Sequence, residues 1–436
     1  MIFWKIFYNT VIVPFMWTAF HIGGLFNNKI RRGIAGRRKL FAALEERAAQ
    51  LSPHTRLWFH ASSMGEFEQA KPIIAELKKS YQDISIVATF FSPSGYEHSK
   101  NYKSADIISY LPFDTHTATN KFISIIKPTA AIMVRYDTWP NIIWALKKNG
   151  IPTFIANATM KKNSSRKFPV LRQFHHSLYN CFTHILTVSE NDTSSFADFD
   201  TTTPIITAIG DTRFDQVMMR SVDAQKKNLL PPSVIAGKKI FIIGQSWEAD
   251  EEIVLPVVFK LQEQIPELLT ILVPHEPTVE HLESLEYQLS GKSTFIRFSD
   301  LNEFHNERII LIDSVGVLVP LYRYAHIAYV GGSFRQGVHN VLEPAAFSLP
   351  IIFGPKHDNS QEAIALTKRN AAFVIEDDKQ LYRIMRTLLE SETIRTTAGK
   401  SARAFVDENI GATRRFLAYL TPFLSSAQGK QPTDAA

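Results

Sequence analysis

Residues Val330–Pro355, VGGSFRQGVHNVLEPAAFSLPIIFGP, carry the pattern that decides the fold. An apolar run at 327–330 predicts a buried strand, and a glycine turn, a loop and a short helix separate it from a second apolar run at 349–353. Buried strands joined through helices are typical of parallel sheets that are covered on both faces. Ligands of such sheets bind outside the carboxyl ends of the strands.

Small and polar residues occupy that end of the first strand. Gly331, Gly332 and Ser333 follow it, and missing Cβ atoms allow backbone N–H groups to approach an anion. Asn340 is expected to cap the short helix, with Glu343 three residues later as in a capping box. Tight packing and an ordinary cap explain each residue equally well. Their concentration in one segment favours a nucleotide-type ligand.

Length and composition narrow the class of protein. A chain of 436 residues predicts two domains of comparable size, and 45% hydrophobic with 21% charged residues excludes wholesale disorder. A net charge of +6 favours anionic partners: phosphorylated lipid, nucleotide or nucleic acid. The single cysteine, Cys181, excludes an intramolecular disulfide. The sequence shows no Cys/His metal spacing, so no metal site is predicted.

The N-terminal sequence predicts a membrane anchor. Residues 6–28 carry no formal charge and come close to the roughly 20 residues that a membrane span needs. Pro14 and the pair Gly23-Gly24 interrupt the pattern, so a shallow or kinked anchor and a buried helix stay open as interpretations. Basic residues at 29–39 follow, which predicts a cytoplasmic location for the next domain and excludes a cleaved signal peptide.

The rest of the chain alternates strand and helix signals. One set runs from 56 to 210, and a second begins at 239 after a polar stretch with Pro231-Pro232. We therefore predict two doubly wound α/β domains that face a cleft. The expected boundaries are 1–40 for the anchor, 41–220 and 221–425 for the domains, and 426–436 for a disordered tail.

Charged residues at the strand ends of the first domain are candidates for chemistry. Pro72 predicts that a helix starts close before it, which leaves Glu66 in the turn or opening helical stretch. There Glu66 can accept a proton or complement the helix N-terminus. Asp137 follows another strand. Arg213, near the end of the first domain, can reach a phosphate or remain a solvated surface side chain.

The second domain has comparable loops. Pro274-His275 ends one strand, and Gly316 places backbone N–H groups at a helix start, where a phosphate can bind. No Walker A sequence is present, and no GxGxxG fingerprint opens either domain.

Eight segments, in order between residues 59 and 355, together resemble one family. They are FHASSMGEFEQAKPII, YLPFDTHTATNKFI, YDTWPN, GDTRFDQ, GQSWEADEE, VPHEP, IDSVGVLVPLY and VGGSFRQGVHNVLEPAAFSLPIIFGP. The family is that of the 3-deoxy-D-manno-octulosonic acid (Kdo) transferases of lipopolysaccharide biosynthesis. The resemblance implies a GT-B fold, a CMP-Kdo donor, a lipid A precursor (lipid IVA) as acceptor, no cofactor, and a place at the cytoplasmic face of the inner membrane.

The resemblance also implies roles for individual residues. Glu66 would be the general base for an inverting transfer, and Asp137 and Arg213 would support the transition state or the departing phosphate. Glu343 would hold the ribose diol and Gly316 the phosphate. The full set expected to bind CMP is Pro274, His275, Val315, Gly316, Val317, Gly332, Ser333, Asn340, Val341, Leu342 and Glu343.

The sequence departs from the family pattern at several of these loops. Arg135 stands where the first residue of an acidic pair is usual, and Asp137 is a shorter second one. Arg213 replaces a common lysine, so a planar fork replaces a point charge. Further departures are Val317 for an acidic residue, Val338 for a glycine, and His275-Glu276 for Arg-His.

Two other functions are compatible with these patterns. One is a GT-B transferase that uses a UDP-sugar donor on a membrane glycolipid. The other is a non-catalytic module that binds anionic lipid. A nucleic-acid role is not expected, because the basic residues cluster beside an apolar segment rather than among aromatic residues on a sheet.

Overall fold

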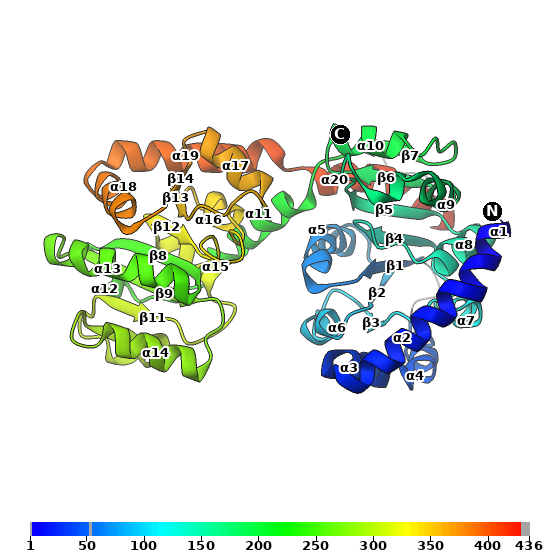
Figure 1. Ribbon diagram of the computed structural model, residues 1–436, viewed down its shortest axis with the longest axis horizontal. Coiled ribbons are helices and arrows are strands. Elements are labelled where there is room, and N and C mark those ends of the chain that lie inside the picture. The colour runs from blue at the N-terminus through cyan, green and yellow to red at the C-terminus, as the bar shows by residue number, and fades with distance from the viewer. Residues whose placement is uncertain (1, 52–54, 429–436) are drawn as a thin grey trace. The chain divides into compact units, whose positions relative to one another are not determined.

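The computed structural model describes residues 2–51 and 55–428. Two compact units divide the chain: unit 1 lies within 1–216 and 410–436, and unit 2 within 217–409. Each unit contains a seven-stranded sheet with helices on both sides (Figure 1). The predicted doubly wound α/β architecture is therefore confirmed for both halves of the chain.

The sheet of unit 1 has the strand order β3-β2-β1-β4-β5-β6-β7, and all neighbouring strands are parallel. The strands are β1 (Thr55–Ala61), β2 (Ile84–Phe90), β3 (Ile107–Tyr110), β4 (Ala130–Val134), β5 (Thr153–Ala158), β6 (His184–Thr187) and β7 (Ile205–Ala208). The connecting helices are α5 (Met64–Ser80), α6 (Pro93–Ser99), α7 (His116–Ile126), α8 (Pro140–Lys148), α9 (Pro169–Tyr179) and α10 (Glu190–Ala197). The strand order reverses between β1 and β4, which is where doubly wound sheets bind ligands.

The sheet of unit 2 repeats this plan with the order β10-β11-β9-β8-β12-β13-β14, again all parallel. The strands are β8 (Lys239–Ser246), β9 (Leu268–Pro274), β10 (Phe295–Arg297), β11 (Ile309–Leu311), β12 (Ile327–Val330), β13 (Ile351–Phe353) and β14 (Ala372–Val374). The main helices are α13 (Glu248–Gln264), α14 (Val279–Leu289), α15 (Leu318–Leu321), α16 (Leu342–Ala346), α17 (Gln361–Lys368), α18 (Asp378–Glu390) and α19 (Glu392–Asn409). Here the order reverses between β8 and β12.

Two helices link the units in sequence. Helix α11 (Thr212–Ala224) begins in unit 1 and ends in unit 2, and the final helix α20 (Ala412–Gln428) returns to unit 1. Phe416, Leu420 and Leu424 of α20 are buried in the core beneath β1 and β5. The sequence-based boundary of 221–425 is therefore wrong for this helix. Of the predicted disordered tail, 426–428 are helical, and 429–436 lie outside the described residues.

Helix α5 starts earlier than expected. It begins at Met64, with Ser63 as its N-cap, and Pro72 lies fully buried in its interior. The prediction that the helix starts close before Pro72 is wrong. Glu66 is the third residue of the helix and so lies in its opening stretch, one of the two placements expected for it.

The N-terminal segment is one long apolar helical stretch. It comprises α1 (Ile2–Phe7), a π-helical turn (Tyr8–Ile12) and α2 (Val13–Phe26), and 2–26 is long and apolar enough to cross a membrane. One side packs on unit 1: the Tyr8 hydroxyl donates to Asp114 at 2.9 Å, and the side-chain amides of Asn9 and Asn141 pair at 2.9 Å. The other side exposes apolar residues: Ile2, Phe3, Ile6, Phe7, Val11, Phe15, Trp17, Ile22, Leu25 and Phe26.

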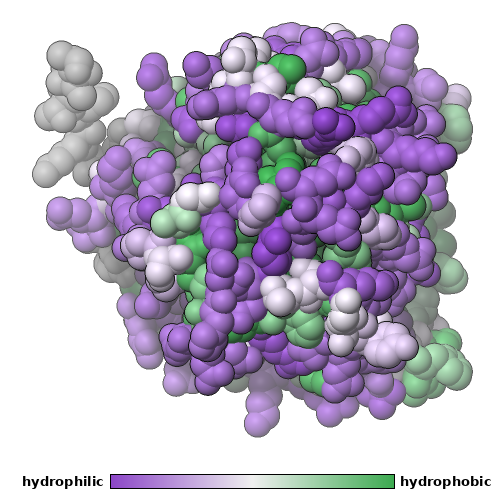
Figure 2. Space-filling view, turned by 90° about the vertical axis from the view of Figure 1, so that its left-hand side faces the viewer, coloured by the Kyte–Doolittle hydropathy of each residue, from purple (hydrophilic) through white to green (hydrophobic). Residues whose placement is uncertain are grey.

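The surface of unit 2 differs in character. Its outer face is mostly hydrophilic, with apolar side chains visible only in patches between charged ones (Figure 2). The exposed large apolar residues of unit 2 are scattered over several elements: Val222, Val279, Tyr287, Val315 and Ile394.

Close backbone approach fixes the loops after β8 and β12. A Cβ atom on Gly331 would lie 2.2 Å from the carbonyl oxygen of Gln245, far inside van der Waals contact. Asp250 of α13 ties the same loops together, since one carboxylate oxygen accepts the amides of Trp247 at 3.0 Å and Gly332 at 2.8 Å. Its other oxygen accepts the Tyr329 hydroxyl at 2.7 Å.

Replacing Gly331 by alanine should therefore destabilise unit 2 by about 1–3 kcal/mol, because the added methyl group forces the loops apart. Urea denaturation followed by circular dichroism measures this change. The matched control is Gly65→Ala, where the new Cβ meets nothing within 4 Å. Equal stability of Gly331→Ala and the wild-type protein would contradict the close approach.

Candidate functional site

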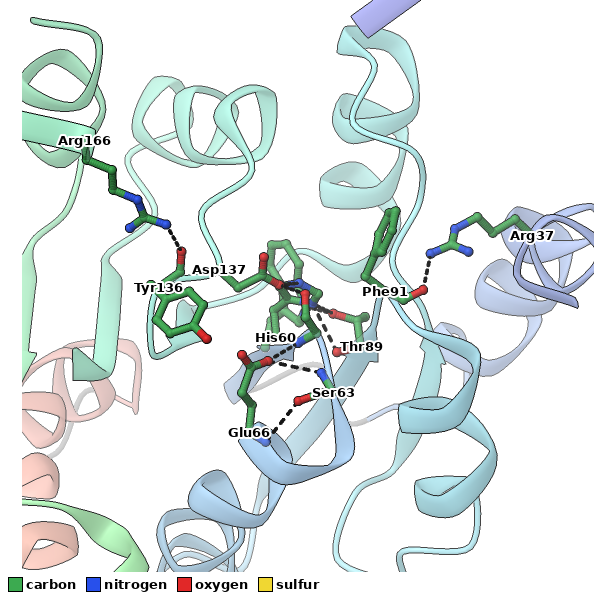
Figure 3. A network of polar contacts seen from close by, with 11 residues as sticks. Arg37, His60, Ser63, Glu66, Thr89, Phe91, Tyr136, Asp137 and Arg166 are labelled. Atoms are coloured by element: carbon green, nitrogen blue, oxygen red, sulfur yellow. Dashed lines mark hydrogen bonds and ion pairs between the residues drawn. The ribbon is translucent and has the colours of Figure 1, made fainter. Parts of the chain in front are cut away.

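The first candidate site lies in unit 1 at the carboxyl ends of β1 and β4, where the strand order reverses. Glu66 follows β1 and Asp137 follows β4, so the structure brings these two predicted residues to one place. Figure 3 shows them with His60 of β1 and Thr89 of β2 in a connected network.

Glu66 belongs to a capping box at the start of α5. Its Oε2 atom accepts the backbone amides of Ser62 at 2.8 Å and Ser63 at 3.1 Å, and the Ser63 hydroxyl accepts the amide of Glu66 at 3.3 Å. These bonds hold the carboxylate in one orientation. Within the described residues, Oε1 accepts no hydrogen bond. The side chain is therefore positioned through one oxygen while the second can take a proton.

Asp137 is held by a different set of donors. Its Oδ2 atom lies 2.6 Å from Nε2 of His60 and accepts the Ser62 hydroxyl. His60 is completely buried, and its Nδ1 lies 2.9 Å from the Thr89 hydroxyl, which also accepts the indole N–H of Trp58 at 2.8 Å. This chain of bonds anchors Asp137 to the interior of the sheet.

The two carboxyl groups differ in acidity. Burial raises the pKa of Glu66 above its ordinary value, and the nearby Asp137 raises it further, against the lowering effect of the Ser62 and Ser63 amides. Burial also acts to raise the pKa of Asp137, but His60 and the Ser62 hydroxyl outweigh it and leave that pKa below its usual range. Asp137 thus stays ionised where Glu66 can exchange a proton.

Arg213 takes no part in the hydrogen bonds of this network. It lies in the first turn of α11, where its Nε donates to Asp211 at 2.8 Å and its NH2 group is 2.7 Å from the same carboxylate. The Arg213 side chain is 36% exposed.

The second candidate site lies in unit 2, at the carboxyl ends of its strands. Gly316 has a φ of +81°, and a Cβ atom there would meet nothing within 4 Å. Val315 beside it is 82% exposed, and Val317 precedes α15 as its N-cap residue. This turn lies at the start of α15.

The glycines after β12 face inward instead. A Cβ atom on Gly332 would lie 2.5 Å from the carbonyl oxygen of Gly337, and Ser333 is fully buried with its hydroxyl accepting the Gly354 amide at 2.6 Å. In this structure both residues shape the loop. Any contact of theirs with a ligand would pass through the backbone.

The segment Asn340–Glu343 differs from the expected capping box. Helix α16 begins at Leu342, with Val341 as its N-cap residue, and the Asn340 side chain accepts the Leu342 amide at 3.1 Å. The Glu343 carboxylate instead accepts a bond from Arg220 of α11 at 2.8 Å, although its side chain is only 9% exposed. Sequence analysis missed Arg220, because more than a hundred residues separate it from Glu343.

His275 belongs to an aromatic stack that sequence analysis also missed. The centre of its ring lies 4.6 Å from that of Trp247 and 4.5 Å from that of His339, and the two stacked histidine rings are nearly parallel. The Trp247 indole donates to Nε2 of His339 at 2.9 Å. Burial and the neighbouring His275 lower the pKa of His339 to about 4, so this ring is neutral. The stack provides a flat surface beside Pro274, which ends β9.

Metal ligands do not gather at either site. Among the residues described by the structure, no group of three or more His, Cys, Asp or Glu side chains is placed to hold a metal ion.

Comparison with known proteins adds independent information. Residues 35–216 match the family model of 3-deoxy-D-manno-octulosonic-acid transferase (kdotransferase). A 3-deoxy-D-manno-octulosonic acid transferase of Haemophilus influenzae is 27% identical over 439 residues, covering 97% of this chain and 99% of that protein. The transferase of the same name from Rickettsia felis is 27% identical and covers 84% of this chain and 79% of its own.

A solved structure supports the fold. UDP-GlcNAc 2-epimerase from Neisseria meningitidis, bound to UDP-GlcNAc, superposes with a TM-score of 0.58 over 84% of this chain and all of its own, at 14% identity. At that identity the likeness concerns the GT-B fold alone. The match of residues 35–216, the two relatives and the eight motifs agree in their likeness: this chain is similar to the 3-deoxy-D-manno-octulosonic acid (Kdo) transferases.

Proposed function

We propose that this protein is an inverting glycosyltransferase that moves Kdo from CMP-Kdo to a lipid A precursor, lipid IVA. The observation that carries the proposal is the Glu66 carboxylate, held by two amides through one oxygen and with a raised pKa. A buried carboxylate with one open oxygen suits a general base for a sugar hydroxyl. The similarity to 3-deoxy-D-manno-octulosonic acid transferases supports the choice of donor and acceptor.

In the proposed reaction, Glu66 accepts the proton from the attacking hydroxyl of the acceptor. The hydroxyl oxygen bonds to the anomeric carbon of Kdo as the bond from that carbon to the CMP phosphate oxygen breaks. Asp137 keeps its negative charge beside the reacting centre, where it favours the positive charge that develops on the sugar. His60 and Ser62 hold Asp137 in place.

Unit 2 would bind the donor. The backbone at Gly316 and the start of α15 would bind the phosphate of CMP. Glu343, oriented by Arg220, would accept bonds from the ribose hydroxyls. The further residues proposed to line this site are Pro274, His275, Val315, Val317, Gly332, Ser333, Asn340, Val341 and Leu342.

Arg213 would stabilise the departing phosphate. Its side chain is 36% exposed and pairs with Asp211. An arginine fork can bind two phosphate oxygens at once.

The N-terminal segment would attach the protein to the cytoplasmic face of the inner membrane. The apolar face of 2–26 can enter the bilayer, and the basic residues that follow it can bind anionic headgroups. Because the opposite face of the segment packs on unit 1 through Tyr8 and Asn9, we propose that the segment lies along the membrane surface.

Changing Glu66 to glutamine should lower turnover by at least about a hundredfold, because the amide cannot accept the proton. The product mass formed from CMP-Kdo and tetra-acylated lipid A precursor measures transfer, and calorimetry measures CMP binding, which should stay unchanged. Glu76→Gln on the exposed side of the same helix is the control and should keep full activity. A near-normal rate of Glu66→Gln would exclude Glu66 as the base.

The raised pKa of Glu66 predicts the pH dependence of the reaction. The base must be ionised, so kcat/KM should rise with pH through a midpoint above the ordinary glutamate value of 4.5. Because the Asp137 charge contributes to that shift, Asp137→Asn should move the midpoint to lower pH. Initial rates between about pH 4 and pH 8 test both statements. An unmoved midpoint in Asp137→Asn would show that another group titrates.

The donor assignment predicts that CMP binds more tightly than UDP in calorimetry. If Glu343 holds the ribose, 2′-deoxy-CMP should bind the wild-type protein about tenfold more weakly than CMP, and Glu343→Ala should bind both nucleotides equally. The exposed Glu283→Ala on α14 serves as control and should keep the discrimination. A preference for UDP would favour a UDP-sugar transferase instead.

A further inference from the structure

Two arginines flank an exposed tyrosine beside the carboxylate network of unit 1. The guanidinium carbons of Arg135 and Arg166 lie 6.0 and 5.7 Å from the ring centre of Tyr136, which is 44% exposed. Arg166 also reaches the Tyr136 carbonyl at 3.5 Å. Tyr136 directly precedes Asp137, and in the view of Figure 3 it lies between Arg166 and Glu66.

The charges of these arginines are not compensated by neighbouring carboxylates. Within the described part of the chain, neither arginine forms an ion pair, and Nε of Arg135 is buried without a hydrogen-bond partner. Two other basic residues that follow Arg166 in sequence are paired: Lys167 with Asp198 at 2.7 Å, and Arg172 with Asp200. A buried donor without a partner is uncommon and points to an acceptor from outside the chain.

The backbone of Arg135 is also unusual. Its φ is +65°, in the left-handed region that non-glycine residues rarely adopt, and its amide donates to the carbonyl of Ala156 at 2.7 Å. Strain of this kind persists where the surrounding structure enforces it, and it gathers at ligand-binding positions. This backbone conformation sets the direction of the Arg135 side chain, directly after β4.

An exposed apolar surface begins next to Arg166. Phe168, Val170 and Leu171, at the start of α9, are 65%, 67% and 44% exposed. Helix α9 packs against α1, since the Phe174 ring lies 5.5 Å from that of Trp4. The exposed apolar residues of α9 therefore adjoin those of the N-terminal segment.

We propose that Arg135 and Arg166 bind a phosphate group of the acceptor glycolipid while its acyl chains lie over the exposed residues of α9 and α1. The inference rests on the proposed function, which requires an amphiphilic acceptor next to Glu66. Guanidinium forks match phosphate geometry, and the neighbouring apolar surface matches the chains of the same molecule. This site would define which hydroxyl of the acceptor reaches Glu66.

Kinetics of the full-length Arg135→Gln and Arg166→Gln variants test this site. The acceptor is lipid A precursor, used either with its phosphates or after their removal by a phosphatase. Each variant should raise KM for the phosphorylated acceptor about tenfold, because one charged hydrogen-bonding group is lost. KM for CMP-Kdo and the KM for dephosphorylated acceptor should equal those of the wild-type enzyme.

Lys162→Gln is the matched control, since it removes one positive charge from the exposed residues just before Arg166 and should leave every constant unchanged. An equal rise of KM in Lys162→Gln would mean that only general electrostatic attraction acts, and would overturn the site. It would also be overturned if the wild-type enzyme used both acceptors equally, or if only KM for CMP-Kdo rose.

Binding of detergent-dispersed acceptor without donor separates this inference from the proposed reaction. The two arginine variants should bind phosphorylated acceptor about tenfold more weakly than the wild-type protein, whether or not Kdo is transferred. Absent transfer with this weakening intact would contradict the proposed reaction alone. Equal binding by the variants and the wild-type protein would contradict the arginine site alone.

Discussion

Buried carboxylates that accept backbone amides hold the loops of this protein in place. All strands of each sheet are parallel, so their loops gather at one edge, and buried N–H groups there must find acceptors. Asp114 accepts the amides of Asn141 and Ile142 at the start of α8, both at 3.1 Å. In unit 2, Asp250 accepts amides from the loops after β8 and β12. Without these acceptors each amide would incur a desolvation penalty of about 1–3 kcal/mol.

The Glu66 carboxylate also accepts two backbone amides, but it differs from Asp114 and Asp250 in one respect. Asp114 and Asp250 use both carboxylate oxygens, whereas the two amide bonds of Glu66 share Oε2. A structural helix cap thus retains one oxygen for chemistry, in an orientation set by the backbone. In the proposed role as a base, Glu66 would need no reorganisation before it accepts a proton, which is how preorganised sites lower barriers.

The sequence was sufficient to predict both sheets, because strands buried on both faces are continuous apolar runs with clear ends. It also predicted that Glu66 and Asp137 follow such runs closely, and the structure has them after β1 and β4. It was insufficient where the outcome depends on distant packing: α20 belongs to unit 1 through Phe416, and Arg220 reaches Glu343. The prediction that a helix starts close before Pro72 was wrong. The core packing of α5 outweighs the hydrogen bond that is lost at a proline inside a helix.

Two carboxylates at the carboxyl ends of neighbouring strands need different environments if they are to have different roles. Burial and the charge of Asp137 raise the pKa of Glu66. Burial also acts to raise the pKa of Asp137, but His60 and Ser62 lower it by more. The asymmetry comes from the fold: His60 is an inward-facing residue of β1 with its other nitrogen on Thr89, so it can support Asp137 and cannot turn toward Glu66. Because environments that push pKa values apart can assign acid–base roles, the contact of the buried His60 with Asp137 supports the proposal that Glu66 is the base.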